Sequence, residues 1–153
     1  MTAGRGPGRR PSRERAITAL IGQRLAYVRL DETIVLGFAG GRRIYVETLA
    51  HVDGPGGRVT VEPGEEHSDA LAALLGDAVR AAHTRDTGEL VVTFASGSEL
   101  LVEVAADAES WAVTEPDGSL VICLARGELA VWYAAERSAP APPACAGSPG
   151  PRY

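Results

Sequence analysis

The chain has 153 residues, of which 45% are hydrophobic and 23% charged, so it is long enough to bury a core as one domain. Its charge is uneven. Residues 1–15 carry a net +4, whereas residues 16–136 hold eight arginines and nineteen carboxylates, a net of −11. Phosphate backbones repel a body this acidic, which excludes nucleic acid as the default partner of the folded part.

Cysteine usage and the lack of long apolar runs bear on location. Cys123 lies in an apolar run and Cys145 in a proline-rich stretch, which makes a poor disulfide pair and suits a reducing compartment. No apolar segment follows the basic N-terminus as it would in a signal peptide, and no apolar run reaches membrane-spanning length. We therefore expect a cytoplasmic protein that does not span a membrane.

The two ends of the chain differ in composition from the middle. Residues 1–11 and 138–153 consist mainly of Gly, Pro, Ser, Ala and Arg. Such segments bury too little apolar surface to offset the entropy of ordering. We predict two disordered tails and a single domain at residues 12–137.

An internal repeat is the strongest signal within that domain. The pattern AIxALIG at residues 16–22 matches ALxALLG at 70–76, a spacing of 54. The pattern FAxGxxIxVE at 38–47 matches FAxGxxLxVE at 94–103, a spacing of 56. The sequence therefore predicts two units, residues 12–62 and 68–133.

Each unit predicts a short helix followed by strands. Ser12 and Ser68 can cap the helices, and Gly22 and Gly76 can end them. Apolar residues at 16, 17, 20 and 21, and at 70, 71, 74 and 75, form the helical stripes. Alternation and turn residues predict strands at 25–30, 33–38, 42–48, 58–62, 78–84, 89–94, 99–104, 110–114, 120–124 and 128–133. We predict an α+β fold, mostly antiparallel β, built from two pseudo-repeated helix-Gly-strand-hairpin units that pair about a pseudo-twofold axis.

The closing part of the second unit carries a resemblance. The patterns SWxV at 110–113, DGxLVxC at 117–123 and GELAVW at 127–132 join LIG at 20–22 and LLG at 74–76. Over about residues 16–133 the chain resembles an uncharacterised actinobacterial family of short proteins, a domain of unknown function. These motifs are core and turn positions, so the resemblance implies a fold and no activity. The chain departs from it at 124–127, where LARG replaces an expected Pro-Gly-Gly turn.

The chain shows no catalytic signature. His51 and His67 fall in predicted loops and His83 on a predicted strand, without the spacing of metal ligands. The flanks of Cys123 are apolar, which indicates a buried structural thiol. We expect no catalytic, metal-binding or cofactor-binding residues and no cofactor. One alternative stays open: Glu47 and Glu103 match across the repeat, and two carboxylates in one cleft can perform acid–base chemistry.

Binding to another protein, with a basic one as the leading case, is the function that we expect. The candidate residues are carboxylates and one tryptophan: Glu47, Glu62, Glu65, Glu66, Glu103 and Trp132. Alternation places Trp132 on the strand face opposite Leu129; we expect a helix to cover it as a core residue, and it suits a binding hot spot only if it is exposed. We predict a non-enzymatic, acidic protein-interaction module, with an immunity-type antidote to a basic toxin as the leading example. The alternative is a nucleic-acid-binding protein that uses the N-terminal arginines Arg5, Arg9, Arg10, Arg13 and Arg15.

Overall fold

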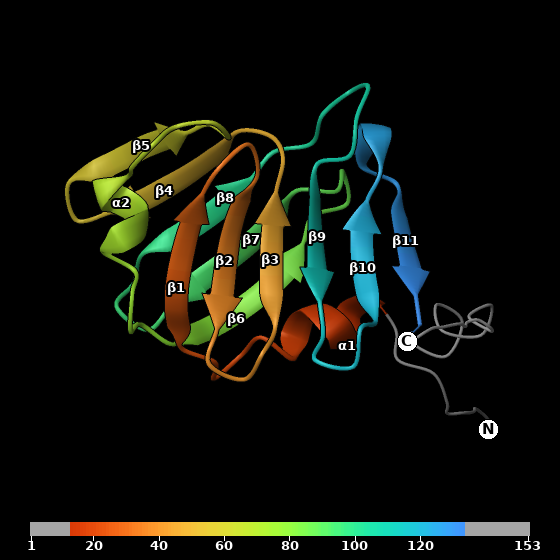
Figure 1. Cartoon of the computed structure of the whole chain (residues 1–153), viewed down its shortest axis with the longest axis horizontal. Helices are drawn as coiled ribbons and strands as arrows, with labels where there is room; N and C mark the ends of the chain where they lie inside the picture. Colours follow the sequence, from red (N-terminus) through yellow and green to blue (C-terminus); the bar gives the residue numbers. More distant parts are fainter. Residues whose placement is uncertain (1–12, 134–153) are drawn as a thin grey trace, which may run out of the picture.

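The computed structural model describes residues 13–133. These residues form two antiparallel sheets that pack face to face, with two short helices at their margins (Figure 1). The first sheet has the order β1-β2-β3-β9-β10-β11, with strands Leu25–Leu30, Ile34–Phe38, Arg43–Val46, Trp111–Thr114, Leu120–Cys123 and Leu129–Trp132. The second has the order β5-β4-β8-β7-β6, with strands Gly57–Val61, Ala50–Gly54, Glu99–Val102, Leu90–Phe94 and Val79–Thr84. The predicted α+β class with mostly antiparallel strands is confirmed.

The hydrophobic core lies between the two sheets. Alternate residues of the central strands point inward, such as Leu36 of β2 and Val92 of β7, and both are fully buried. Trp111 of β9 is 1% exposed, and its indole N–H donates to the backbone oxygen of Gly88 at 3.0 Å. Cys123 is buried in the same core, which confirms the prediction of a structural thiol.

Each sheet contains strands from both predicted units. Strands β1 to β3 continue through the β3–β9 pairing into β9 to β11, while β4 and β5 join β6 to β8 through the β4–β8 pairing. The prediction that the two units bury their sheet faces together therefore missed an exchange of strands. The two sheets also meet along one side, where an isolated bridge links Arg24, ahead of β1, to Ala78, ahead of β6.

Strand β4 corrects one sequence prediction. The segment Ala50–Gly54 was expected to be a loop that contains His51, and it is a strand paired on both sides. Only Ala50 and Val52 of this segment are apolar, and a glycine-rich turn follows at once, so its alternation was too short to recognise.

The helices are shorter than the apolar stripes suggested. Helix α1 spans Arg13–Thr18 and α2 spans Asp69–Ala72. The Ser68 hydroxyl accepts a hydrogen bond from the Leu71 N–H at 3.2 Å, which confirms the predicted cap, while Ser12 lies outside the described residues. Ile21 and Leu75, each 46% exposed, lie beyond the helices and outside the core.

The helices within residues 13–133 all fall short of the length and apolar character that crossing a membrane requires.

Candidate functional site

Four chain connections at one end of the sandwich carry an unusual concentration of carboxylates. We call these segments, residues 31–33, 47–49, 62–66 and 103–109, the acidic rim; they lie along the upper edge of Figure 1. The rim contains nine carboxylates and no arginine, whereas the two other connections at this end, residues 85–89 and 124–128, hold three carboxylates and two arginines. Five of the six predicted partner-binding residues belong to it, namely Glu47, Glu62, Glu65, Glu66 and Glu103.

Backbone hydrogen bonds join these connections to one another. The Gly64 N–H donates to Asp31 O at 2.9 Å, which ties the β5–α2 connection to the β1–β2 turn. The Glu103 N–H donates to Leu49 O at 3.0 Å, and the Glu47 N–H donates to Ser110 O at 2.8 Å. These bonds fix the four segments as two pairs, 31–33 with 62–66 and 47–49 with 103–109.

Most of the rim carboxylates have no counter-charge in the part of the chain that the structure describes. Asp31 lies 3.6 Å from the guanidinium of Arg29, Glu65 accepts the Glu62 N–H at 2.8 Å, and Glu103 contacts His51. The remaining six have no side-chain partner among residues 13–133: Glu32, Glu47, Glu62, Glu66, Asp107 and Glu109. Such unpaired surface carboxylates create a negative field that attracts a basic partner.

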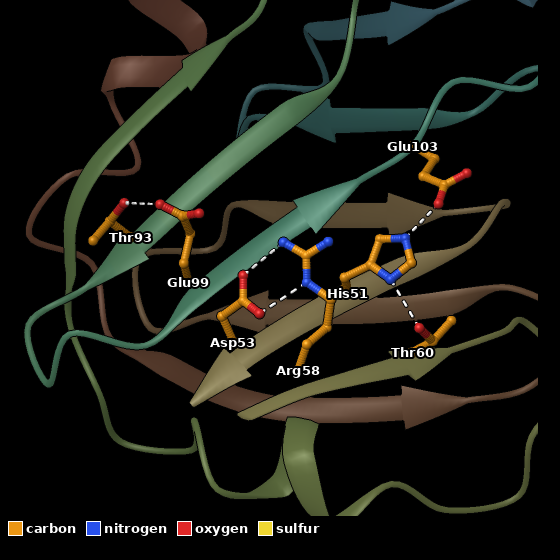
Figure 2. Close-up of polar contacts among 7 residues, drawn as sticks. All are labelled: His51, Asp53, Arg58, Thr60, Thr93, Glu99 and Glu103. Atoms are coloured by element: carbon orange, nitrogen blue, oxygen red, sulfur yellow. Dashed lines mark hydrogen bonds and ion pairs between the residues drawn. The ribbon is translucent and has the colours of Figure 1, made fainter. Parts of the chain in front are cut away.

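A hydrogen-bonded cluster covers the outer face of the second sheet and reaches the rim at Glu103 (Figure 2). His51 of β4 stands between Glu103 and Thr60: its Nε2–H donates to the Glu103 carboxylate, and its Nδ1 lies 2.9 Å from Thr60 Oγ1. Arg58 of β5 makes a two-pronged pair with Asp53 at 2.9 and 2.8 Å, and this pair lowers the pKa of Asp53. Each of these side chains is held by a neighbouring strand.

Thr60, His51 and Glu103 are the residue types of a catalytic triad, with a hydroxyl, an imidazole and a carboxylate linked in a row. Acyl transfer also needs N–H donors that converge on the developing oxyanion. Thr60 is exposed on the edge strand β5, whose backbone N–H groups lie in the plane of the sheet and do not rise above the hydroxyl. We conclude that the contacts among these three side chains hold Glu103 and His51 in place and have no catalytic role.

Glu47 and Glu103 lie on different sheets. Glu103 points outward from the second sheet beside His51, whereas Glu47 lines a cavity on the outer face of the first sheet with Val35 and Tyr45. Because the sheets pack through their inner faces, the two carboxylates lie on opposite outer sides of the sandwich. Glu103 does not line the cavity that Glu47 lines, so this arrangement gives the hypothesis of an acid–base pair no support.

Trp132 does not belong to the rim. It is 53% exposed and pairs with Leu120 at the other end of the first sheet, so the prediction of a core position is wrong. Helix α1 contacts β11 on the core face, where Leu129 and Val131 pack, so the indole on the other face of this edge strand is left uncovered. The alternation along one strand does not show which of its faces another element covers, so the sequence could not predict that Trp132 is exposed.

The other sequence candidates are scattered. Arg5, Arg9 and Arg10 lie outside the described residues, and Arg13 and Arg15 are on α1. Desolvation raises the pKa of the Cys123 thiol, which keeps it protonated and unreactive. Within residues 13–133 no three His, Cys, Asp or Glu side chains are grouped to hold a metal ion.

The fold and the rim together define a two-sheet antiparallel sandwich with an acidic end. The chain belongs to the family of unknown function DUF6188, which it matches over residues 16–133. No curated protein and no solved structure gives a significant match.

Proposed function

We propose that this chain is a non-enzymatic protein-interaction module that binds a basic partner protein through the acidic rim. The observation that carries the proposal is the rim itself: nine carboxylates without an arginine, six of them without a partner among the described residues. An exposed field of one sign speeds the encounter with a protein of opposite sign and selects against acidic ones. An immunity-type antidote that covers a basic toxin is the form of this function that we favour, acting in the cytoplasm.

The strand exchange supports a rigid binding end. The rim connections come from both predicted units, and backbone bonds tie them together in two pairs, which holds each connection in place before a partner arrives. Preorganisation of this kind lowers the entropy lost on binding.

Duplication of one ancestral unit is a second part of the proposal. The Gly22 N–H donates to Val79 O and the Gly76 N–H donates to Leu25 O, both at 2.8 Å, and the members of each set are 54 positions apart. Strands β1 and β6 also share a register shift, between Leu25 and Tyr27 and between Val79 and Ala81. If the units are equivalent, Gly22→Ala and Gly76→Ala should each destabilise the fold by about 1 kcal/mol, since both glycines have positive φ and open surroundings.

Affinity capture from the source lysate tests the binding function. Three baits are compared: the full-length chain, a rim variant (Glu62→Gln, Glu66→Gln, Glu109→Gln) and a control variant (Glu14→Gln, Asp86→Asn, Glu128→Gln). The two variants remove the same charge from exposed positions inside and outside the rim. We expect one basic protein, identified by mass spectrometry, with the full-length chain and the control variant, and much less of it with the rim variant.

Two results would overturn the proposal. One is a neutral or acidic protein captured equally by all three baits. The other is nucleic acid in the eluate that disappears when residues 1–15 are removed, which would establish the alternative of nucleic-acid binding by the N-terminal arginines.

A further inference from the structure

A cavity of about 510 Å³ opens on the outer face of the first sheet, next to the rim. We call it the β2 trough because it lies over strand β2. One wall comes from the end of β1 and the turn after it, with Arg29, Asp31 and Glu32, and the other comes from β3, with Tyr45 and Glu47. The cavity is therefore shaped by two neighbouring strands on either side of β2.

Val35 closes the bottom of the trough and is itself almost fully covered by its neighbours. Val35 pairs with Arg29 on one side and Tyr45 on the other, and it is 3% exposed although it points away from the core. The hydroxyl of Tyr45 accepts a hydrogen bond from Arg43, two residues before it, while Glu47 follows two residues after it. The tyrosine ring therefore forms a fixed aromatic wall beside a carboxylate.

The charges of the trough are unbalanced. Arg29 pairs with Asp31, whereas Glu32 and Glu47 have no partner among the described residues. Glu103 occupies the matching position in the second sheet. Glu47 follows β3 and Glu103 follows β8, and each donates its backbone N–H to a neighbouring connection. Glu103 receives the N–H of His51, but the position in the first sheet that corresponds to His51 holds Ala112. Glu47 thus lacks the donor that its counterpart has.

An aromatic wall beside carboxylates that have no partner among the described residues matches one kind of group. An arginine side chain is apolar along its stem, and its planar guanidinium stacks on an aromatic ring and pairs with a carboxylate through two N–H bonds. A lysine ammonium is more strongly hydrated and cannot stack in this way. The cavity is also larger than one arginine side chain needs, so it admits the chain of a partner beside it.

We propose that the β2 trough takes an arginine side chain of the basic partner, with the guanidinium against Tyr45 and its N–H groups on Glu47 and Glu32. This inference rests on the proposed function and names the group that the rim end recognises. It makes the interaction selective for arginine, whereas the rim as a whole responds to any positive charge.

The probe is the blocked tripeptide acetyl-Gly-Arg-Gly-amide, titrated into the full-length chain at low salt and followed by backbone amide chemical shifts. Matched peptides with lysine or citrulline in place of arginine are the controls, since citrulline keeps the shape and loses the charge. We expect saturable shifts at Val35, Tyr45 and Glu47, binding of the lysine peptide weaker by about fivefold, and no saturation with citrulline.

Variants separate the trough from the general field of the rim. Glu47→Gln should weaken binding of the arginine peptide by about fivefold, and Tyr45→Leu should remove most of the preference for arginine over lysine. Asp107→Asn removes the same charge from the rim outside the trough and should change the affinity less than twofold, by screening alone. Folding of each variant is checked by its amide spectrum.

Equal weakening by Glu47→Gln and Asp107→Asn would overturn the inference, and so would arginine-induced shifts that spread over the rim without Tyr45 and Glu47. Those outcomes leave the proposed function standing, provided that the captured partner still depends on the rim. If the rim variant binds the partner as well as the unmodified chain does, the proposed function fails whatever the trough binds.

Discussion

The two ends of the sandwich use their charged residues in opposite ways. At the end away from the rim, the connections 39–42, 55–56, 95–98 and 115–119 contain three charged side chains, and each has an internal partner. Arg42 pairs with Glu115 at 3.4 Å, and Asp117 accepts the Ser119 N–H at 2.8 Å. At the acidic rim six of nine carboxylates have no side-chain partner within residues 13–133.

This difference separates charges that hold the fold from charges that are free for a partner. The Arg42–Glu115 pair is about four-fifths buried, with side chains 21% and 19% exposed, so it acts within the protein. The unpaired rim carboxylates repel one another, which costs stability and is expected where a surface is kept for binding. Four predictions follow the comparison from the largest expected effect to the smallest.

Replacing a glycine with alanine should cost more stability at the rim end than at the opposite end. Gly127 has a φ of 90°, and a Cβ there would overlap the Thr87 oxygen, so Gly127→Ala should lower the free energy of unfolding by about 3 kcal/mol. Gly97 has a φ of 100° in an opposite-end turn with open surroundings, so Gly97→Ala should cost only about 1 kcal/mol. Urea denaturation measures both, and equal losses would contradict the close packing at Gly127.

Neutralising one carboxylate should lower the stability of the fold at the opposite end and raise it at the rim. Glu115→Gln removes the partner of the mostly buried Arg42 and should destabilise the fold by about 1–2 kcal/mol. Glu66→Gln removes one unpaired rim charge and should stabilise it by a few tenths of a kcal/mol, roughly, at low salt. Thermal unfolding in low and high salt checks this, because the gain from Glu66→Gln should vanish when salt screens the rim. A loss of stability from Glu66→Gln would show that it has an internal role.

Glu103 and Glu47, which occupy matching positions of the repeat, should contribute differently to the stability of the fold. Glu103→Ala breaks the contact with His51 and should cost about 1 kcal/mol, whereas Glu47→Ala removes an unpartnered side chain and should stay within about 0.5 kcal/mol of the unmodified chain. Chemical denaturation of the two variants under one condition gives the difference. Equal effects would mean that the His51 contact adds nothing to stability.

Acid should destabilise the end away from the rim by protonating Asp117. The backbone N–H of Ser119 lowers the pKa of Asp117, so its contribution to stability is present above the unfolded pKa of about 3.9 and is lost as the pH falls through the folded pKa. Asp117→Asn should therefore flatten the loss of stability between about pH 5 and pH 3. Unfolding free energies across that range measure the slope, and an unchanged slope would contradict the role of this hydrogen bond.

The sequence predicted local structure better than the arrangement of the site. Alternating apolar residues identified strands such as β2 and β7, and the Ser68 cap was found from its position before an apolar stripe. Strand β4 was missed because only Ala50 and Val52 mark its buried face. The repeat could not show that β4 pairs with β8 and β3 with β9, because long-range pairing depends on which sheet faces meet.

The rim was only partly visible in the sequence. Its residues were candidates because of their charge, but nothing local places Glu62 and Glu103 at the same end, forty-one positions apart. Matching positions in a repeat suggested that Glu47 and Glu103 meet, but Glu47 follows β3 of the first sheet and Glu103 follows β8 of the second. Trp132 shows the same limit, because one strand's alternation does not say whether another element covers its outer face.

The dissociation constant of the captured basic partner, measured for the full-length chain, the rim variant and the control variant at two salt concentrations, tests the central claim most directly. We predict that the rim variant binds about tenfold more weakly at low salt, which corresponds to three contacts of about 0.5 kcal/mol each. The control variant should differ less than about twofold, and the gap should narrow at high salt. Equal affinity of the rim and control variants would contradict the account, because the rim would then be no more than a solvated end of the fold.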